Sequence, residues 1–300
     1  MAAIVFAGGG MPLQKVLEAA VKLESIRIST VFTDLAADAD IVRFCERHAI
    51  ATADIARLGR KAPDDPLPPH DWFFSVNATI IFSARVLAAP RHGALNMHPG
   101  RLPDYAGLHT HQWAIRNGET EFASTLHWMT EALDAGPVAF ARSFPIKPKE
   151  TGLSLFLKCL SAGAALVTEA LQVIGRGERL PQTPQDLGRR RLYRAADARS
   201  GDIDWRWSAL AIERFVRAAD YGPLVCPTYH PSAKINGQSL LIQKAEALDQ
   251  PLLGAEPGLV VRVDQGAVTI GAGDGRGLVI TRWRDQRAVG TPIAVGSRLS

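Results

Sequence analysis

Apolar and polar positions at the start of the chain alternate between two kinds of pattern. Residues 3–7 are a short apolar run of the kind found in buried strands, and residues 26–32 carry the isoleucines and valine of a second strand. Residues 12–23 and 41–48 instead carry apolar side chains at helical spacing, and the glycines 8–10 separate the first strand from the first helix. Strand, turn, helix, strand and helix in this order predict an α/β fold built on a parallel sheet.

The same alternation continues into the middle of the chain. Strands are expected at residues 72–76, at 93–98 and at 124–129, and a further strand ends at 144–148. Helices are expected at 109–117 and at 152–174, where apolar residues recur every three or four positions. Together these elements predict a first domain that spans residues 1–180.

A change of composition follows this domain. Residues 176–194 contain six arginines, two acidic residues and two prolines, so we expect residues 181–204 to form an interdomain linker. A solvated connector is the preferred interpretation, and binding of an acceptor phosphate by the guanidinium groups stays open. Residues 205–300 carry a helix at 209–219 and four short strands, near 239–245, 258–263, 267–270 and 277–283, which predict a small β-barrel.

Composition excludes several classes of protein. The chain is 47% apolar and 21% charged, and its net charge of +4 does not require a nucleic-acid partner. Its three cysteines are far apart and odd in number, which argues against a disulfide framework. No apolar run in the sequence approaches the roughly 20 residues of a membrane span, and the first residues lack the basic region of a signal peptide. We therefore expect a cytoplasmic protein with no membrane partner.

Candidate chemistry gathers around the strand at residues 93–98. Asn96 and His98 share one face of this strand, and Asp134 follows the next strand in a short loop. Singly, each side chain has a structural reading, but an amide, an imidazole and a carboxylate at neighbouring strand ends form a plausible catalytic set. The pair His109 and His111 has no acidic or cysteine partners at ligand spacing, so no metal is expected.

The motifs Asn96-x-His98-Pro99, Leu102-Pro103, Tyr105-x-Gly107 and Asp134-x-Gly136 resemble the signature of the 10-formyltetrahydrofolate-dependent formyltransferases. The resemblance is strongest between residues 73 and 164. It departs from the family at Gly100-Arg101, where relatives more often carry Ser-Leu. It implies a Rossmann-like formyltransferase domain followed by a smaller OB-like β-barrel, with 10-formyltetrahydrofolate as the formyl donor.

The resemblance also implies roles for individual residues. Asn96, His98 and Asp134 are the expected catalytic residues: His98 as general base, Asn96 as donor to the formyl oxygen, and Asp134 as the group that orients or stabilises His98. The expected donor pocket contains Ile80, Ile81, Phe82, Leu102, Pro103, Thr130, Glu131, Ala132 and Leu133. Expected acceptor-binding residues are Gly9, Gly10, Tyr105 and His109. His127 either faces this site or is a core histidine.

The acceptor is not decided by these motifs. The segment after the second strand, residues 34–40, is short and acidic, whereas relatives that formylate methionyl-tRNA carry a long basic loop there. A small amine or hydroxylamine, such as a nucleotide-linked amino sugar or an amino-acid-derived precursor, is therefore the preferred acceptor. Methionyl-tRNA formylation, formyltetrahydrofolate hydrolysis, non-catalytic folate binding and a homodimeric state stay open.

Overall fold

The computed structural model describes residues 1–63, 65–198, 200–264, 266–285 and 293–300. Its contacts divide the chain into two compact units. The first consists of Met1–Gly107, Phe122–Phe144 and Leu157–Leu192, and the second of Leu108–Glu121, Pro145–Phe156 and Tyr193–Ser300. Two short segments from the middle of the chain thus belong to the same unit as the C-terminal part. The domain limits expected at residues 180 and 204 stay a prediction.

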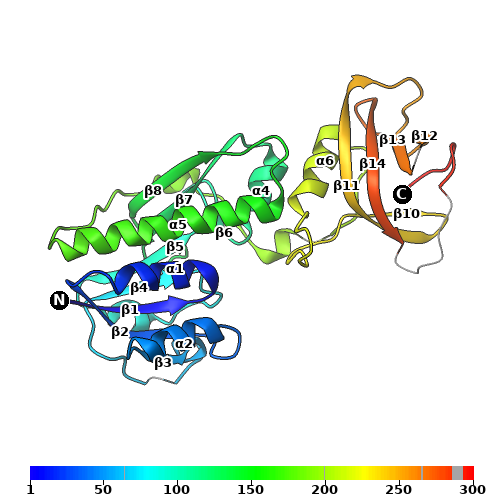
Figure 1. Ribbon diagram of the computed structural model, residues 1–300. Coiled ribbons are helices and arrows are strands. Elements are labelled where there is room, and N and C mark those ends of the chain that lie inside the picture. Colours follow the sequence, from blue (N-terminus) through cyan, green and yellow to red (C-terminus); the bar gives the residue numbers. More distant parts are fainter. Residues whose placement is uncertain (64, 199, 265, 286–292) are drawn as a thin grey trace. The chain divides into compact units, whose positions relative to one another are not determined.

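A seven-stranded sheet forms the centre of the first unit (Figure 1). Its strand order is β3 (Ala51–Asp54), β2 (Ile26–Thr33), β1 (Ala2–Gly8), β4 (Trp72–Val76), β5 (Gly93–His98), β7 (Glu121–Trp128) and β8 (Val138–Pro145). Neighbours from β3 to β5 are parallel, whereas β5 and β7 are antiparallel. This parallel-dominated sheet confirms the predicted α/β, Rossmann-like class. The strand β3, only four residues long and without a buried side chain, was not among the expected elements.

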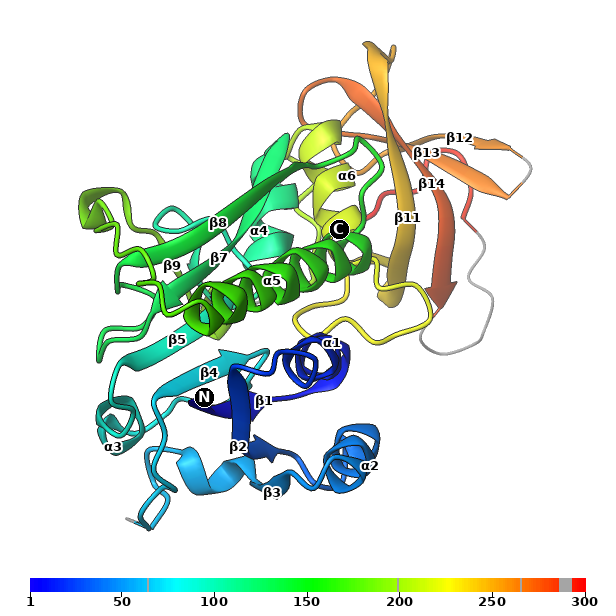
Figure 2. The same cartoon turned by 60° about the vertical axis from the view of Figure 1, so that its left-hand side comes forward.

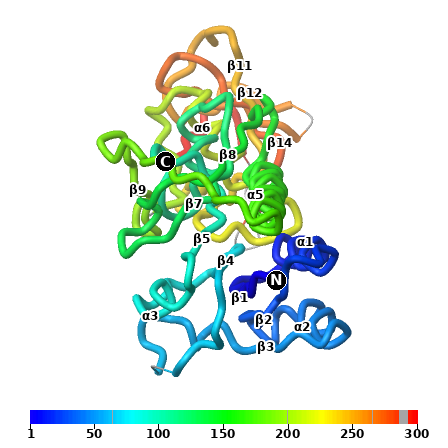
Figure 3. The backbone as a smooth tube through the Cα atoms, turned by 90° about the vertical axis from the view of Figure 1, so that its left-hand side faces the viewer, coloured from blue at the N-terminus to red at the C-terminus, as the bar shows by residue number. Residues whose placement is uncertain are grey.

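Helices cover both faces of this sheet. Figures 2 and 3 show α1 (Gly10–Ala20) and α2 (Ala39–Arg47) on one face and the short α3 (Ala84–Ala88) on the opposite face. The apolar stripe of α1, with Leu13, Val16 and Leu17, is fully buried. Helices α1 and α2 each begin two residues before their expected first residue. Helix α3 was not expected, because its five residues bury only Val86.

Strand alternation decides which side chains share each face of the sheet. The rings of Phe6 and Phe74 lie 5.9 Å apart on one face. Val5, Phe73 and Ala94 belong to a buried cluster on the other face. Because alternate residues of a strand point to the same side, Asn96 and His98 follow Ala94 on the face of this cluster.

Strand order switches direction between β1 and β4. At that point the backbone of the turn after β1 lies very close to the backbone at the end of β4. Gly8 has φ +147, and a Cβ there would lie 1.8 Å from the carbonyl oxygen of Val76. The next amide, that of Gly9, donates to this same oxygen at 3.2 Å. Open α/β sheets bind ligands beyond the carboxyl ends of their strands at such a switch. The tight turn therefore places Gly9 and Gly10 at the edge where ligands are expected.

Helix α5 (Gly152–Gly175) is the one described helix that is long and apolar enough to cross a membrane by length and composition. This corrects the expectation that no stretch of the chain approaches that length. In its most apolar window, 44% of the residues are buried. Within the first unit α5 packs so closely that a Cβ at Gly163 would lie 2.6 Å from the side chain of Met97 on β5. The core helix of a soluble protein meets the same criterion.

The second unit contains a five-stranded antiparallel sheet. Its strand order is β10 (Ser232–Ile235), β11 (Gln238–Pro251), β14 (Arg276–Asp285), β13 (Ala267–Gly271) and β12 (Val260–Asp264). The last residues bridge its two edges: Lys234 and Ser300 exchange backbone hydrogen bonds of 2.7 and 2.9 Å, and Leu299 donates to Gly258 at 2.8 Å. A sheet whose edges are joined in this way is a small barrel, as predicted. Strand β10 was not expected.

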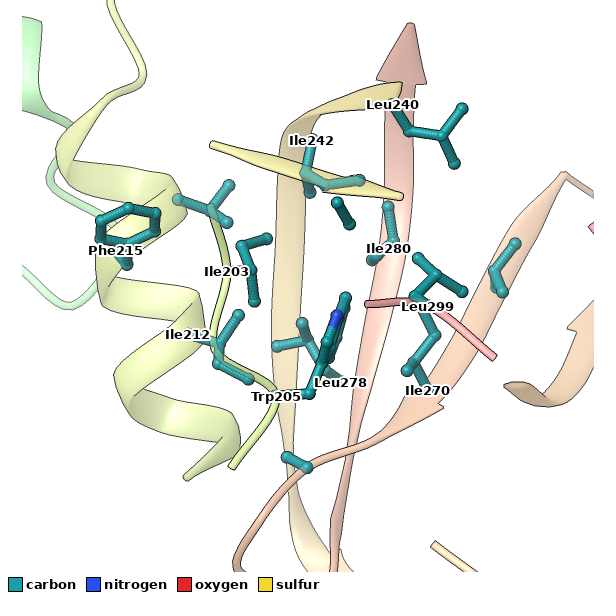
Figure 4. Close-up of a cluster of buried hydrophobic side chains, with 14 of the residues drawn as sticks. Ile203, Trp205, Ile212, Phe215, Leu240, Ile242, Ile270, Leu278, Ile280 and Leu299 are labelled. Atoms are coloured by element: carbon teal, nitrogen blue, oxygen red, sulfur yellow. The ribbon is translucent and has the colours of Figure 1, made fainter. Parts of the chain in front are cut away.

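Apolar side chains from the sheet and from one helix fill the barrel. One buried cluster contains Ile242, Leu278 and Ile280 of the sheet together with Ile212 and Phe215 of α6 (Ala209–Ala218). Figure 4 shows α6 at one side of this cluster. Ser208 caps the start of this helix, and its hydroxyl accepts the amide hydrogen of Ala211 at 3.2 Å. The helix predicted at residues 209–219 is confirmed, and it contributes one wall of the barrel core.

Substituting Gly8 tests the tight strand switch. We expect Gly8→Ala to lower the free energy of unfolding by at least about 3 kcal/mol, because the new Cβ meets a backbone oxygen that cannot move alone. Gly177→Ala is the matched control: Gly177 also has positive φ, but a Cβ there meets nothing within 4 Å, so we expect a loss of about 1 kcal/mol. Denaturant unfolding measures both, and equal losses would contradict the clash.

Candidate active site

The pairing of β5 with β7 brings the candidate residues together. In this antiparallel pair Asn96 lies opposite His127, and His98 lies opposite Thr125. Residues directly opposite each other on antiparallel strands project to the same face. Asn96, His98 and His127 therefore share one face of the sheet, although His127 lies 31 positions from Asn96 in the sequence.

His98 is held by a backbone carbonyl. Its side chain is almost wholly buried, and its Nε2 lies 2.7 Å from the carbonyl oxygen of Tyr105. A carbonyl only accepts hydrogen bonds, so Nε2 carries the hydrogen and the lone pair of the neutral ring is at Nδ1. A glycine is needed beside this bond, because a Cβ at Gly100 would lie 2.4 Å from Nε2 of His98. The Nδ1 atom faces Asp134, with 3.6 Å between it and Oδ2.

Asp134 reaches the histidines from a strained loop. Its φ of +51 lies in the left-handed region, which is uncommon for a residue other than glycine. Its Oδ2 accepts the amide hydrogen of Gly107 at 2.8 Å, and its Oδ1 lies 3.4 Å from Nε2 of His127. The carboxylate is thus placed between two imidazole rings and is only 6% exposed as a residue.

Opposing effects set the protonation of this carboxylate. Burial raises the pKa of Asp134, but attraction to positive charge on the His98 or His127 imidazole and the hydrogen bond from the Gly107 amide together hold that pKa well below its usual range. Asp134 is therefore ionised at neutral pH, and it can stabilise a positive charge on an imidazole beside it.

His98 is shifted in the direction that favours a neutral base. Burial lowers its pKa, and the nearby His127 acts in the same direction. The Asp134 carboxylate and the Tyr105 carbonyl act against this shift, but burial is the larger effect. At neutral pH His98 is therefore an uncharged imidazole whose lone pair at Nδ1 can accept a proton.

His127 is a site residue whose role the strand pattern alone left undecided. Its Nδ1 lies 2.9 Å from the carbonyl oxygen of Trp128, which assigns the hydrogen to Nδ1 in the neutral ring. Its Nε2 can then accept a hydrogen from the amide of Asn96 at 3.2 Å. One hydrogen of the Asn96 amide remains for another acceptor. The signal in the sequence was the alternation of His127 with apolar neighbours, which is equally typical of a core histidine.

The turn after His98 is tied to the adjacent strand. Thr125 donates its hydroxyl hydrogen to the carbonyl of Gly100 at 2.7 Å, and the Leu102 amide points back to that hydroxyl at 3.4 Å. The peptide bond between Leu102 and Pro103 is cis. Leu102 and Pro103 are both partly exposed, so this expected donor-pocket segment is accessible to a ligand. Thr125 was not among the expected site residues.

The other expected donor-pocket residues form two groups. Phe82 is buried in the cluster beneath this face, Ile80 packs against the same cluster, and Ile81 is 52% exposed. Thr130, Glu131, Ala132 and Leu133 are exposed in the loop that leads to Asp134. Phe82 and Ile80 thus contribute to the core, and Ile81 is the exposed member of this group; their place in a donor pocket stays a prediction.

The expected acceptor-binding residues lie in different surroundings. Gly10 is exposed, and its amide donates to Oδ1 of Asp38 at 2.8 Å. Tyr105 is buried, its ring packs against Phe122 at 5.1 Å between centroids, and its carbonyl serves His98. His109 belongs to the second unit, where it precedes α4 (Thr110–Asn117) in a left-handed conformation.

Within the residues that the structure describes, no group of three or more histidine, cysteine or acidic side chains is arranged to hold a metal ion. His111 makes a different contact: its Nε2 lies 2.6 Å from the hydroxyl of Tyr221, and its ring stacks on Phe156.

Comparison with known proteins places this geometry in a family. The family models described as formyl transferase and as formyl transferase, C-terminal domain, match residues 74–171 and 197–289. A methionyl-tRNA formyltransferase from Synechococcus sp. (strain JA-3-3Ab) is 36% identical over 148 residues, which cover 49% of this chain and 46% of that protein. One from Burkholderia pseudomallei (strain 668) is 30% identical over 241 residues, 77% of this chain and 71% of the relative.

A solved structure has the same fold at lower sequence identity. The N-formyltransferase from Helicobacter canadensis, in complex with folinic acid and dTDP-3-aminofucose, aligns with a TM-score of 0.69 and 19% identity. The alignment covers 93% of this chain and 99% of that one. Both family models lie in the order expected from the sequence, and the Burkholderia relative is matched over most of its length. The chain belongs to the formyltransferase family.

Proposed function

We propose that this protein transfers the formyl group of 10-formyltetrahydrofolate to a primary amine or hydroxylamine of a small metabolite. The observation that carries the proposal is the placement of the Asp134 carboxylate 3.6 Å from His98 Nδ1 and 3.4 Å from His127 Nε2, beside the amide of Asn96. An ionised carboxylate, a neutral imidazole and an amide donor on one face are the groups that acyl transfer to an amine requires.

Each residue has a distinct part in the proposed reaction. The amine nitrogen bonds to the formyl carbon, the bond from that carbon to N10 of the folate breaks, and a proton passes from the amine to N10. His98 accepts the amine proton at Nδ1, and the imidazolium that forms faces Asp134. Asn96 donates its remaining amide hydrogen to the formyl oxygen, where such a donor contributes about 3 kcal/mol.

The donor is bound, in this proposal, beside the Asp134 loop. Leu102 and Pro103 are partly exposed and residues 130–133 are exposed next to the catalytic set, and Ile81 supplies apolar surface above the buried Phe82. Family membership supports the formyl donor, as does the folinic acid present in the structure of the Helicobacter canadensis relative.

Charge at the edge near Gly10 favours a small acceptor. The segment 34–40 carries Asp34, Asp38 and Asp40, and Asp38 accepts hydrogens from both the Gly10 amide and the Thr33 hydroxyl. An acidic edge attracts an amine, and it disfavours tRNA, which carries many phosphates, more than a small acceptor with at most one diphosphate. The dTDP-3-aminofucose in the structure of the Helicobacter canadensis protein is a nucleotide-linked amino sugar, which belongs to the proposed class of acceptors. Methionyl-tRNA is the alternative, supported by the names of the sequence relatives.

Replacing His98 tests the proton-transfer role. We expect His98→Ala to lower kcat at least about a hundredfold, because general-base catalysis contributes about 10²–10⁴ in rate, while folate binding is retained. His230→Ala, at an exposed histidine of the second unit, is the matched control and should retain full turnover. Release of tetrahydrofolate measures turnover and folate fluorescence quenching measures binding. Wild-type turnover in His98→Ala would refute the assignment.

The pH dependence of kcat/KM follows from the burial of His98. Because burial lowers the pKa of His98, its neutral form persists below the ordinary value of about 6.5. Activity should be complete above the pKa in the folded protein and decline as the pH falls through it. With an acceptor whose amine does not titrate in this range, we expect the acid limb below pH 6.5; a limb centred above pH 7 would contradict a neutral, buried base.

A panel of acceptors decides the substrate class. It should contain dTDP- and UDP-linked amino sugars, ornithine, N-hydroxyornithine and charged initiator tRNA, each assayed with 10-formyltetrahydrofolate. We expect turnover with at least one small amine and none with tRNA. Turnover with tRNA alone would replace the small acceptor by the alternative, and consumption of the donor at the same rate without any amine would indicate hydrolysis.

A further inference from the structure

The segment from Pro181 to Arg190 runs along the loop that carries Asp134. The indole nitrogen of Trp128 donates to the carbonyl of Pro181 at 2.8 Å. Thr183 and Val138 then exchange two backbone hydrogen bonds, of 2.8 and 2.9 Å. These contacts join both ends of the loop, residues 128 and 138, to one short stretch of chain. The segment, which was expected to be a solvated linker, is largely exposed, and these hydrogen bonds attach it to the loop within the first unit.

Gln185 lies at the centre of this stretch and contacts the loop at Asp134 itself. Its Nε2 donates to the carbonyl oxygen of Asp134 at 3.0 Å and to that of Gly136 at 2.6 Å. A side-chain amide nitrogen has two hydrogens, and these two carbonyls use both of them. The orientation of the Gln185 amide follows, since its oxygen cannot face two carbonyl oxygens.

Two arginines of the same segment bind the two loops next to the catalytic set. Arg190 donates from Nη2 to the carbonyl of Leu133 at 2.5 Å. Arg189 donates to both carboxylate oxygens of Asp104, at 3.0 and 2.8 Å, and Asp104 directly precedes the residue whose carbonyl holds His98. One segment thus contacts both loops that supply groups to the site.

The Asp134 loop needs such support for two reasons. A non-glycine residue in the left-handed region is higher in energy by about 1–2 kcal/mol, so the loop does not adopt this shape by its own preference. The chain is also tight next to it, where a Cβ at Gly136 would lie 2.0 Å from the carbonyl oxygen of Trp128. Catalytic groups must be held within about 0.5 Å of their working positions, and a loop supplies that precision only when its backbone is tied.

We propose that Gln185 is a positioning residue that holds the Asp134 carboxylate between His98 and His127 by binding the carbonyls of Asp134 and Gly136. The inference rests on the proposed catalytic role of Asp134. Gln185 touches no reacting group, and it acts only through the backbone of the loop.

The groups that face His98 determine what loss of this support would change. They are the Asp134 carboxylate from the loop, His127 from β7 and the Tyr105 carbonyl from the turn. The Arg190 guanidinium lies on the Leu133 carbonyl, one residue before Asp134, and the Arg101 guanidinium lies 5.5 Å from the centre of the Tyr105 ring. Of these five groups, only the Asp134 carboxylate belongs to a residue whose backbone is bound by Gln185. Loss of the Gln185 hydrogen bonds is therefore expected to displace this carboxylate and to leave the other four groups in place.

Gln185→Met removes both hydrogens while keeping the length of the side chain. We expect kcat to fall about tenfold with the KM for the donor within about twofold, since two hydrogen bonds are lost outside the donor pocket. The acid limb of kcat/KM should move to lower pH, because a displaced carboxylate no longer stabilises the His98 imidazolium. Gln182→Met, on the same segment and exposed, is the matched control and should change neither quantity.

A second readout does not need activity. In protein labelled with ¹⁵N-histidine, the His98 resonance is identified by its loss in His98→Ala, and its titration gives the imidazole pKa of the folded molecules. We expect this pKa to be lower in Gln185→Met than in the wild type, and lowest in Asp134→Asn. Gln185→Ala serves as the second variant if the methionine variant is unstable.

The outcomes separate the two proposals. An unchanged His98 pKa and an unchanged acid limb in Gln185→Met would overturn the positioning role, even if kcat fell through lower stability. A wild-type protein without formyl transfer to any acceptor would instead overturn the proposed function. In that case the histidine titration still decides whether Gln185 places the carboxylate.

Discussion

The burial of one carboxylate between two imidazole rings is the constraint on which the site depends. Asp134 is ionised in a nearly closed environment, and an isolated buried charge of this kind is strongly unfavourable. The Gly107 amide and the two histidines supply the favourable partners. Each histidine has its other nitrogen bound to a backbone carbonyl, so a proton taken up by either ring is placed on the nitrogen that faces the carboxylate.

The fold provides this arrangement through ordinary rules of sheet geometry. The antiparallel partner β7 places His127 opposite Asn96, which a parallel neighbour with a different register would not do. Gly100 leaves room for the hydrogen bond from His98 to Tyr105, and the cis bond before Pro103 lies in the same turn. The candidate site is therefore built on an exact strand register with two tied loops, whereas the parallel half of the sheet supplies a rigid support.

Many of the helices and strands could be predicted, because the spacing of apolar residues along the chain determines where they form. Apolar runs mark β1, β2, β4 and β5, and helical spacing marks α1, α2 and α5, within a few residues of their observed ends. Elements of two to five residues, such as β3 and α3, were not predicted, because they bury too few side chains to produce a periodic pattern of apolar residues. Strand β10 was not predicted for a different reason. It is stabilised by pairing with β11 and with the C-terminal residues, and this pairing cannot be recognised from the residues of β10 alone.

The sequence by itself determined the α/β class, the barrel at the end of the chain, and the face that Asn96 and His98 share, because side-chain alternation along a strand is a property of the local backbone. It also carried the family motifs around Asp134. Only the tertiary structure decided that His127 joins the site, which nitrogen of His98 is free, and that Gln185 reaches the Asp134 loop from 51 positions away. The physical reason is that these assignments depend on hydrogen bonds between distant segments, and such partners exist only after the chain has folded.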